Sequence, residues 1–261
     1  MKLHTRFLLL CCLFITQSVS ALESDALFTI DVTARSQSRE DRNAALSEAL
    51  QLVLNRFVIE NDIVHNSALK SALENAASYV DQYQYIAHAD DTKNSSSAIM
   101  RVTFAKDSLT ALLHSSGLAM WGEKRDKTLV WIFIEQKGKQ AFLDMEQDTE
   151  IAAALQSEAR AKGILLLLPL MDLEEKQTIS GTDILATRSE KILLASSRYD
   201  VASILSGKLH KQRTCWRTEW ALYFDNKLEQ WTTPCSDLNT NLSRAFARVY
   251  EYLSVFYALK S

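Results

Sequence analysis

Two nearly uninterrupted apolar runs, Leu129–Ile134 and Ile164–Leu168, constrain the fold of this chain more than any other feature of its sequence. Strands of this composition are covered on both faces, as in parallel sheets. Between the runs, residues 147–162 are rich in alanine and are followed by Gly163, which predicts a helix that ends at the glycine. Two buried strands joined by a helix require a crossover, so we expect parallel neighbours in a right-handed β-α-β unit.

The rest of the second half extends this sheet. A helix near residues 190–197 leads to another apolar segment, Val201–Leu205, which we expect to be a third parallel strand. A hairpin over residues 213–234, turning at Asp225–Lys227, adds antiparallel strands. A last helix begins near Asp237 and carries an apolar stripe at helical spacing. Such a stripe favours packing on the sheet over membrane binding, because few basic residues occupy its polar face.

The first half has a different order of patterns. Leu27–Thr33 alternates apolar and polar residues, which indicates a half-buried strand. Ser38 with Asp41 resembles a capping box, and the residues that follow place apolar side chains on one face of a helix. A shorter helix, two strands and a final helix follow, at residues 67–77, 79–85, 99–104 and 109–117. This order predicts a small α+β domain.

Residues 1–21 have the features of a secretory signal peptide. Lys2 and Arg6 precede the apolar run Phe7–Ile15, and Val19–Ala21 resembles a signal-peptidase site. The apolar run is about half of the roughly 20 residues needed to span a bilayer. We therefore expect cleavage after Ala21, export to the periplasm and no transmembrane segment afterwards. An N-terminal anchor that is not cleaved is the alternative.

The remaining chain is expected to contain an N-terminal α+β domain, residues 22–120, and a C-terminal α/β domain, residues 121–261. The second has a mixed, partly parallel sheet and a C-terminal helix. Residues 1–21 carry two of the 29 basic residues and none of the 32 acidic ones, so the processed chain has a net charge of −5. It has no basic block, which makes nucleic acid an unexpected partner.

Two of the four cysteines lie in the leader, which leaves Cys215 and Cys235. Because the periplasm is oxidising, they predict one disulfide bond, with two unpaired thiols as the alternative. Simple strand alternation places Cys215 on the face opposite to Trp220 but Cys235 on the face of Trp231. A bulge near Pro234 would remove this conflict.

The sequence carries few signals of catalytic chemistry. The chain has no nucleophile elbow, zinc-binding helix, phosphate loop or dinucleotide fingerprint. The four histidines beyond the leader have no second histidine or cysteine at metal-ligand spacing: His65, His88, His114 and His210. We therefore expect no catalytic residue, no cofactor and no metal site.

One candidate ligand site follows from the expected sheet. Open parallel sheets bind ligands beyond the carboxyl ends of their strands. Here those ends carry Glu135, Asp172 and Lys208, which define a possible ligand crevice. The structural alternative treats the same region as turns and solvated surface, formed by Pro169, Asp172, Glu174, Glu175 and Gly207.

The tryptophans are a second candidate. Trp216, Trp220 and Trp231 cluster by hairpin geometry, and Trp121 lies at the expected domain junction. Aromatic residues often anchor interfaces, but in domains of this size they belong more often to the core, which is the interpretation that we favour.

Several segments together carry a family resemblance: Arg42–Arg56, Tyr79–Tyr85, Val102–Phe104, Trp121–Gly122 with Arg125, Leu167–Leu173, Ala195–Tyr199 and the tryptophans at 216, 220 and 231. On these segments, nearly all of residues 22–261 resembles an exported bacterial family known as domain of unknown function 2066. One position departs from the family pattern, because Asp126 stands where proline is expected after Arg125. The family has no assigned reaction, so the resemblance implies kinship and leaves the function open.

In topology, the second half is similar to the small α/β domains of the curli-secretion lipoprotein and of lipoproteins that activate cell-wall synthases. The first half is similar to a domain of flagellar outer-ring assembly proteins. These resemblances imply a partner-binding or assembly module. We expect a non-catalytic periplasmic protein that binds an envelope protein. The alternative is a periplasmic hydrolase or small-ligand-binding protein that uses the crevice of Glu135, Asp172 and Lys208.

Overall fold

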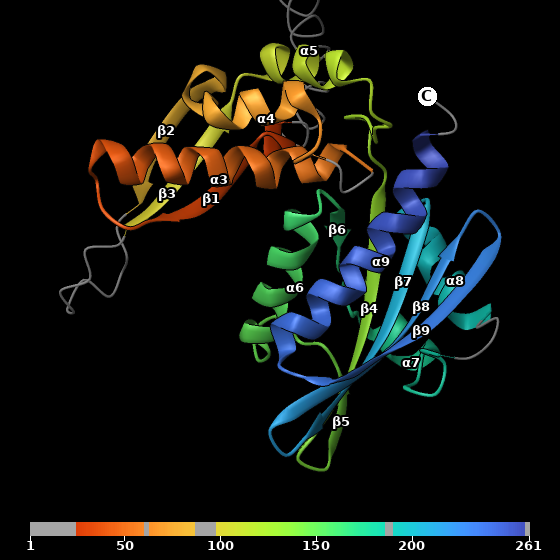
Figure 1. The fold of residues 1–261 in the computed structure, drawn as a ribbon. Coiled ribbons are helices and arrows are strands. Elements are labelled where there is room, and N and C mark those ends of the chain that lie inside the picture. Colours follow the sequence, from red (N-terminus) through yellow and green to blue (C-terminus); the bar gives the residue numbers. More distant parts are fainter. Residues whose placement is uncertain (1–24, 60–62, 87–97, 186–189, 259–261) are drawn as a thin grey trace, which may run out of the picture. The chain divides into compact units, whose positions relative to one another are not determined.

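The computed structural model describes residues 25–59, 63–86, 98–185 and 190–258 (Figure 1). The chain divides into two compact units, of which the first ends at Glu123 and the second begins at Lys124. Within the described ranges, no helix combines the length and the apolar character needed to cross a bilayer. The expected signal peptide, residues 1–21, lies outside the described residues, so its cleavage stays a prediction.

The first unit contains a three-stranded antiparallel sheet in the order β1-β3-β2, with α3 packed against it. The predicted order of strands and helices is confirmed. The elements are β1 (Thr29–Ala34), α3 (Arg39–Phe57), α4 (Ser67–Glu74), the 3-10 helix η2 (Ala76–Tyr79), β2 (Val80–Ile86), β3 (Ala98–Phe104) and α5 (Lys106–Ser116).

Helix α3 begins and packs as its sequence predicts. The side chain of Ser38 accepts a hydrogen bond from the backbone N–H of Asp41 at 3.1 Å, which satisfies a free donor of the first turn. Arg56 lies on the buried face and is 1% exposed. Its Nη1 donates to the carbonyl oxygens of Leu27 at 2.7 Å and Thr29 at 2.9 Å. This side chain therefore ties α3 to the beginning of β1.

The second unit is built on a six-stranded mixed sheet in the order β5-β4-β7-β8-β9, with β6 paired to the beginning of β4. Both β6 and β7 run parallel to β4, which confirms the predicted β-α-β unit and the third parallel strand. The strands are β4 (Lys127–Gln136), β5 (Lys139–Phe142), β6 (Leu165–Leu167), β7 (Ser203–Gln212), β8 (Cys215–Phe224) and β9 (Lys227–Ser236). The helices are α6 (Thr149–Ala161), α7 (Leu173–Thr178), α8 (Glu190–Ser196) with the 3-10 helix η3 (Ser197–Tyr199), and α9 (Leu238–Ala258).

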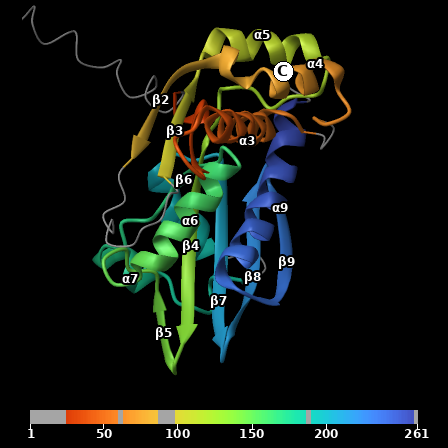
Figure 2. The same ribbon diagram turned by 60° about the vertical axis from the view of Figure 1, so that its left-hand side comes forward.

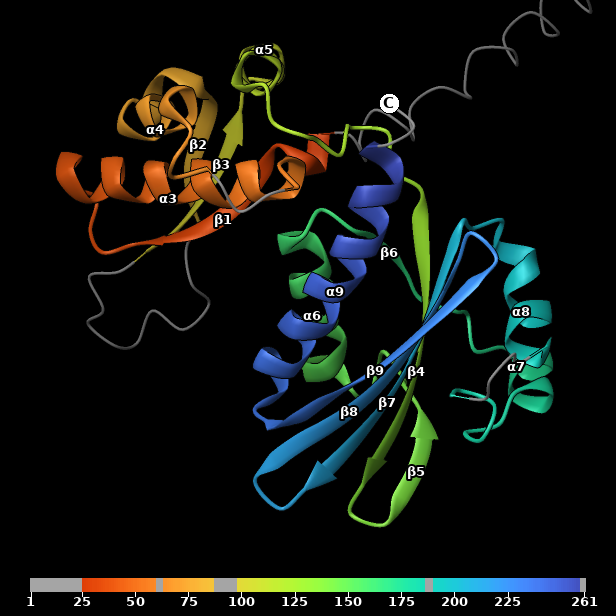
Figure 3. The same cartoon turned by 45° about the vertical axis from the view of Figure 1, so that its right-hand side comes forward.

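Helices cover both faces of this sheet. On one face, α6 and α9 lie side by side (Figure 2). On the other face lie α7 and α8 (Figure 3). Because β4 is covered on both sides, all residues from Thr128 to Ile134 are buried, as its continuous apolar run predicts.

The tryptophans are mainly core residues. Trp121 is buried in the first unit, and Trp216 and Trp220 are buried in the second. Trp231 lies opposite Trp220 in the β8–β9 register and is half-buried. This placement favours the core interpretation of these side chains over an exposed aromatic interface.

The β8–β9 hairpin contains both the predicted turn and the predicted bulge. Asp225 and Asn226 connect the strands with φ values of 51° and 58°, as in a type I′ turn. Near the other end of the hairpin, Pro234 and Cys235 together face a single residue of β8. Cys235 is joined there by a disulfide bond to Cys215, with the two Cα atoms 5.5 Å apart.

Replacing both Cys215 and Cys235 with serine should lower the free energy of unfolding of the second unit by about 2 kcal/mol. The bond joins residues separated by 20 positions and restricts the unfolded chain. Urea unfolding with and without a reductant measures the effect. The reductant should destabilise the wild type and leave the double variant unchanged, whereas an equal response of both proteins contradicts the prediction.

Candidate functional site

The structure brings together two of the three residues of the predicted ligand crevice. Lys208 Nζ lies 2.8 Å from Glu135 Oε1, and His210 Nδ1 lies 3.0 Å from Glu135 Oε2. Gln140, on β5, donates a further hydrogen bond to Glu135 Oε1 at 3.0 Å. Asp172 takes part in a different network.

The separation of Asp172 from Glu135 and Lys208 follows from the lengths of the parallel strands. β6 has three residues, and its last residue, Leu167, faces Leu129 near the start of β4. β7 continues to Gln212 instead of ending at Leu205, so Lys208 lies inside the strand. The three residues are therefore divided between two groups.

The group around Glu135 has the properties of a structural ion pair. The hydrogen bond from Lys208 is the largest cause that lowers the pKa of Glu135, and His210 acts in the same direction. A carboxyl group that stays ionised is a poor proton donor near neutral pH. In the described part of the chain, no group of three or more His, Cys, Asp or Glu side chains is placed to hold a metal ion.

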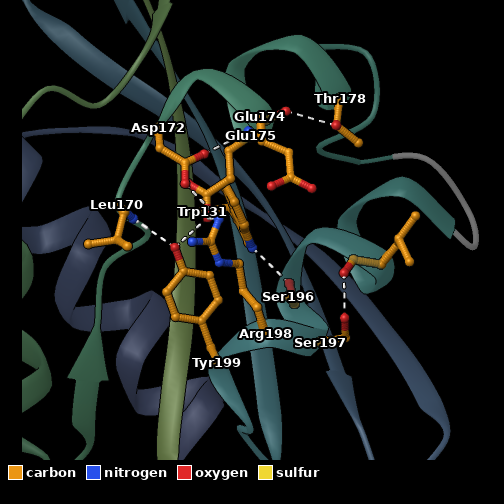
Figure 4. A network of polar contacts seen from close by, with 11 residues as sticks. Trp131, Leu170, Asp172, Glu174, Glu175, Thr178, Ser196, Ser197, Arg198 and Tyr199 are labelled. Carbon is orange, nitrogen blue, oxygen red and sulfur yellow. Dashed lines mark hydrogen bonds and ion pairs between the residues drawn. The ribbon is translucent and has the colours of Figure 1, made fainter.

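A second polar network joins α7 to the end of α8 (Figure 4). Asp172 Oδ1 caps α7 by accepting a hydrogen bond from the backbone N–H of Glu175 at 3.0 Å. Arg198 Nη1 lies 2.7 Å from Asp172 Oδ2 and 3.7 Å from Glu175 Oε1. The N–H of Glu175 and then the guanidinium of Arg198 lower the pKa of Asp172, which therefore carries its charge at neutral pH.

Tyr199 connects this network to the loop before α7. Its hydroxyl donates to Glu175 and accepts a hydrogen bond from the backbone N–H of Leu170 at 2.8 Å. Burial, followed by the bond to Glu175, raises the pKa of Tyr199 to about 12, so the phenol keeps its proton. Trp131 Nε1 donates to Ser196 Oγ at 2.9 Å, which ties the end of α8 to β4.

Glu175 is the buried acid of this network. The structural interpretation of the sequence treats Glu174 and Glu175 as solvated, but only Glu174 is exposed, whereas Glu175 is 2% exposed. Glu175 Oε2 has no hydrogen-bond partner among the described residues. Burying a carboxylate with an unsatisfied oxygen costs free energy. The contacts of Glu175 with Tyr199 and Arg198 offset this cost, so the position of α7 depends on these two side chains.

Four leucines around the network expose their side chains, and we call them the leucine surface. Their exposed fractions are 70% for Leu170, 72% for Leu173, 40% for Leu193 and 70% for Leu194. The first two lie on either side of Asp172, and the other two lie about one helical turn before Arg198. The ion pair of Asp172 with Arg198 therefore joins the two segments that carry these leucines.

A groove of about 850 Å³ adjoins the leucine surface at Leu170. It lies between the β4–β5 hairpin, the loop of residues 143–148 and the loop of residues 169–171. Lys137, Lys139 and Lys176 are also part of its lining. Its volume is within the range of small-molecule sites, roughly 300–1,000 Å³. The apolar lining includes Ile134, Phe142, Leu143, Met145, Pro169 and Met171.

Sequence reasoning places Asp172 at a crevice and does not identify Glu175, Arg198 or Tyr199 as its partners. One local signal was present, because Asp172 followed three residues later by Glu175 is a helix-start pattern.

Replacing Tyr199 with phenylalanine should lower the free energy of unfolding by about 2 kcal/mol at neutral pH, because the N–H of Leu170 and the carboxylate of Glu175 lose a partner. The folded pKa of about 12 lies above the ordinary value of 10. This contribution is therefore present below pH 10 and is lost as the pH rises toward 12. Urea unfolding across this pH range should show that the free energy of unfolding falls less steeply for the variant than for the wild type. Identical profiles of the two proteins at alkaline pH would contradict the prediction.

One family model matches part of the chain. It is described as a domain of unknown function (DUF8605) and matches residues 21–122, which end within the first unit. The expectation of an uncharacterised domain is confirmed at this level, but the matching model is not that of domain of unknown function 2066. No curated protein and no solved structure matches the chain.

Proposed function

We propose that the protein is a non-catalytic, partner-binding module of the bacterial envelope and that the leucine surface contacts its partner. The observation that carries this proposal is the exposure of Leu170, Leu173 and Leu194, each at least 70% accessible to solvent. Covering one such side chain completely stabilises a complex by roughly 1.5–3 kcal/mol. These leucines lie on segments that one polar network joins, and exposed apolar side chains of this size are candidates for contact with a partner.

The polar network supports this proposal because it holds the leucine surface in one conformation before binding. The ion pair of Asp172 with Arg198 and the hydroxyl of Tyr199 connect the segments on which the leucines lie. A surface that is already ordered loses less conformational entropy when a partner docks. The arrangement is therefore suited to recognition of a partner.

A periplasmic location is part of the proposal. It rests on the export signal expected in residues 1–21 and on the disulfide bond of Cys215 with Cys235, a bond typical of oxidising compartments. The match to the uncharacterised family begins at residue 21, which is compatible with a separate leader. Kinship with domain of unknown function 2066 and the likeness to envelope assembly domains remain proposals of the same kind.

Site-specific photo-crosslinking in living cells tests the binding function. A photoreactive residue is placed at Leu173 or Leu194 of the full chain, and a matched control is placed at Val255, an exposed apolar residue of α9. We expect both leucine positions to capture the same envelope protein and the Val255 position not to capture it. Equal capture from all three positions, or none from the leucines, contradicts the proposal.

The location has its own test. The intact mass of the protein recovered from the periplasmic fraction should correspond to a chain that begins at Leu22. A chain that retains residues 1–21 and stays in the membrane fraction after salt washing would support the N-terminal anchor instead.

The groove favours a second candidate function, which is the binding of a small ligand. Its volume of about 850 Å³ fits a small organic molecule with both apolar and polar groups, because its lining combines apolar residues with three lysines and three carboxylates, Asp144, Glu146 and Asp148. Thermal unfolding in the presence of a panel of such compounds tests this function. A stabilising compound should lose its effect when Lys176 and Lys139 are replaced with alanine, and a panel without effect removes the candidate.

A further inference from the structure

Helix α7 is attached to the second unit by polar contacts more than by apolar packing. The residue of this helix that is buried is Glu175, whereas Leu173 is exposed. By comparison, α6 buries the apolar side chains of Ile151 and Leu155. Most helices of globular proteins are held by the burial of an apolar face. The position of α7 therefore depends on the polar network that contains Glu175.

The burial of Glu175 makes opposing contributions to this attachment. The hydroxyl of Tyr199 donates a hydrogen bond to the carboxylate, and Arg198 Nη1 lies 3.7 Å from its Oε1 (Figure 4). Its Oε2, however, is removed from water and has no hydrogen-bond partner among the described residues. Opening of α7 breaks the contacts with Tyr199 and Arg198 but returns both oxygens to water. The closed position is therefore favoured by less free energy than that of a helix with an apolar buried face.

The loop before α7 contains a strained residue. Met171 has a φ value of 52°, in the left-handed region that side chains of its kind seldom adopt. The polar network fixes the residues on either side of it, because the N–H of Leu170 donates to Tyr199 and Asp172 pairs with Arg198. Strained residues of this kind cluster at ligand clamps and switch regions. Release of the polar network would allow Met171 to relax.

The same segment forms one side of the groove of about 850 Å³. Pro169, Leu170, Met171 and Lys176 supply this side, and the β4–β5 hairpin with the loop of residues 143–148 supplies the other. The hairpin belongs to the sheet, because β5 pairs with β4 in register. The side chains of the polar network hold the first side from outside the groove. Release of the network would therefore move the first side and leave the second in place.

We propose that residues 169–178 form a movable wall of the groove and that the polar network of Asp172, Glu175, Arg198 and Tyr199 keeps this wall closed. A ligand that contacts both sides of the groove stabilises the closed position, whereas its arrival and departure require the open one. The control of access to a ligand rests on the small-ligand function proposed for the groove. The motion of the wall does not depend on that function.

The reactivity of an introduced thiol tests this inference. Leu143 is 7% exposed and lines the groove, and it also lines a smaller pocket together with Pro169 and Met171. Leu143→Cys therefore places a thiol behind the movable wall, while the other two cysteines of the processed chain stay joined in the disulfide bond. Adding Tyr199→Phe should accelerate the reaction of this thiol with a maleimide by about tenfold or more, because the wall loses the hydroxyl that holds it.

Two controls separate opening of the wall from unfolding of the whole unit. At low urea concentrations, the reaction rate of Leu143→Cys should not depend on urea, because opening of the wall exposes little surface. Leu155→Cys, buried in α6, should react more slowly and faster with added urea, because its thiol becomes accessible only on unfolding. Tyr252→Phe, in α9, also removes a hydroxyl that donates to a carboxylate, that of Glu229, and should leave the Leu143→Cys rate unchanged.

Three results would overturn the inference. Equal rates and equal urea dependence of the two thiols would mean that the wall opens only when the unit unfolds, and this comparison decides even if Tyr199→Phe does not fold. No acceleration by Tyr199→Phe, or equal acceleration by Tyr199→Phe and Tyr252→Phe, would mean that the polar network does not control the wall.

These measurements need no ligand, so they are independent of the small-ligand function. If no compound stabilises the protein but the thiol of Leu143→Cys responds as expected, the movable wall stands and the ligand function fails. If a compound binds in the groove but the thiol does not respond to Tyr199→Phe, the ligand function stands and the movable wall fails.

Discussion

Replacing Arg56 with methionine should lower the free energy of unfolding of the first unit by about 4 kcal/mol. Arg56 is 1% exposed, and its Nη1 donates to the backbone carbonyls of Ala26 at 3.2 Å, Leu27 at 2.7 Å and Thr29 at 2.9 Å. Methionine fills much of the same volume but donates no hydrogen bond. The three carbonyl oxygens at the beginning of β1 would lose this donor, and buried acceptors without a partner are costly.

Hydrogen–deuterium exchange and urea unfolding measure this effect. Peptides that contain β1 should exchange faster in Arg56→Met than in the wild type, because opening of the strand no longer breaks the bonds to the guanidinium. Arg39→Met, at the exposed start of the same helix, is the matched control and should change stability by less than about 0.5 kcal/mol. A loss below about 1 kcal/mol for Arg56→Met would show that water or neighbouring groups replace the arginine.

Replacing Gly207 with alanine should lower the free energy of unfolding of the second unit by about 3 kcal/mol. A Cβ atom at this position would lie 2.3 Å from Cζ3 of the Trp220 ring. Trp220 is 1% exposed, and its Nε1 donates to Thr218 Oγ1 at 2.7 Å. Because the ring is buried and hydrogen-bonded, it cannot move aside without disturbing the packing around β8.

A double-mutant cycle with Trp220→Leu tests the cause. The single replacement of Trp220 removes buried surface and should itself be destabilising. In a protein that already carries Trp220→Leu, Gly207→Ala should lower the free energy of unfolding by at least about 1 kcal/mol less than it does in the wild type, because the ring that opposes the new methyl group is gone. Gly122→Ala is the matched control, since a Cβ atom there meets no heavy atom within 4 Å. Additive effects of the two replacements would contradict the steric explanation.

Much of the fold was predictable because its signals are local. The stripe from Ala45 to Phe57 and the cap at Ser38 specify α3 through helix periodicity and a free backbone donor. Gly117 ends α5 in the left-handed conformation that glycine adopts readily. The buried run of β4 indicates a covered parallel strand without knowledge of its neighbours.

Shorter elements were missed because they carry too few local signals. β5 has four residues and α7 has six, so neither contains enough positions for a period to be distinguished from chance. The end of β7 was also misjudged, because Gly207 reads as a turn residue in sequence. In the structure it is a strand residue, whose missing side chain leaves room for the ring of Trp220 on the next strand.

By itself, the sequence determined the type and order of the main elements and the parallel pairing around β4, because these follow from residue spacing within each segment and from the order of the segments. Only the tertiary structure decided that Asp172 pairs with Arg198 while Glu135 pairs with Lys208. It also decided that Glu175 is buried and that Leu173 stays exposed. These outcomes depend on which strand ends beside which helix. Packing sets the distances between separate segments, and residue spacing within one segment carries no information about those distances.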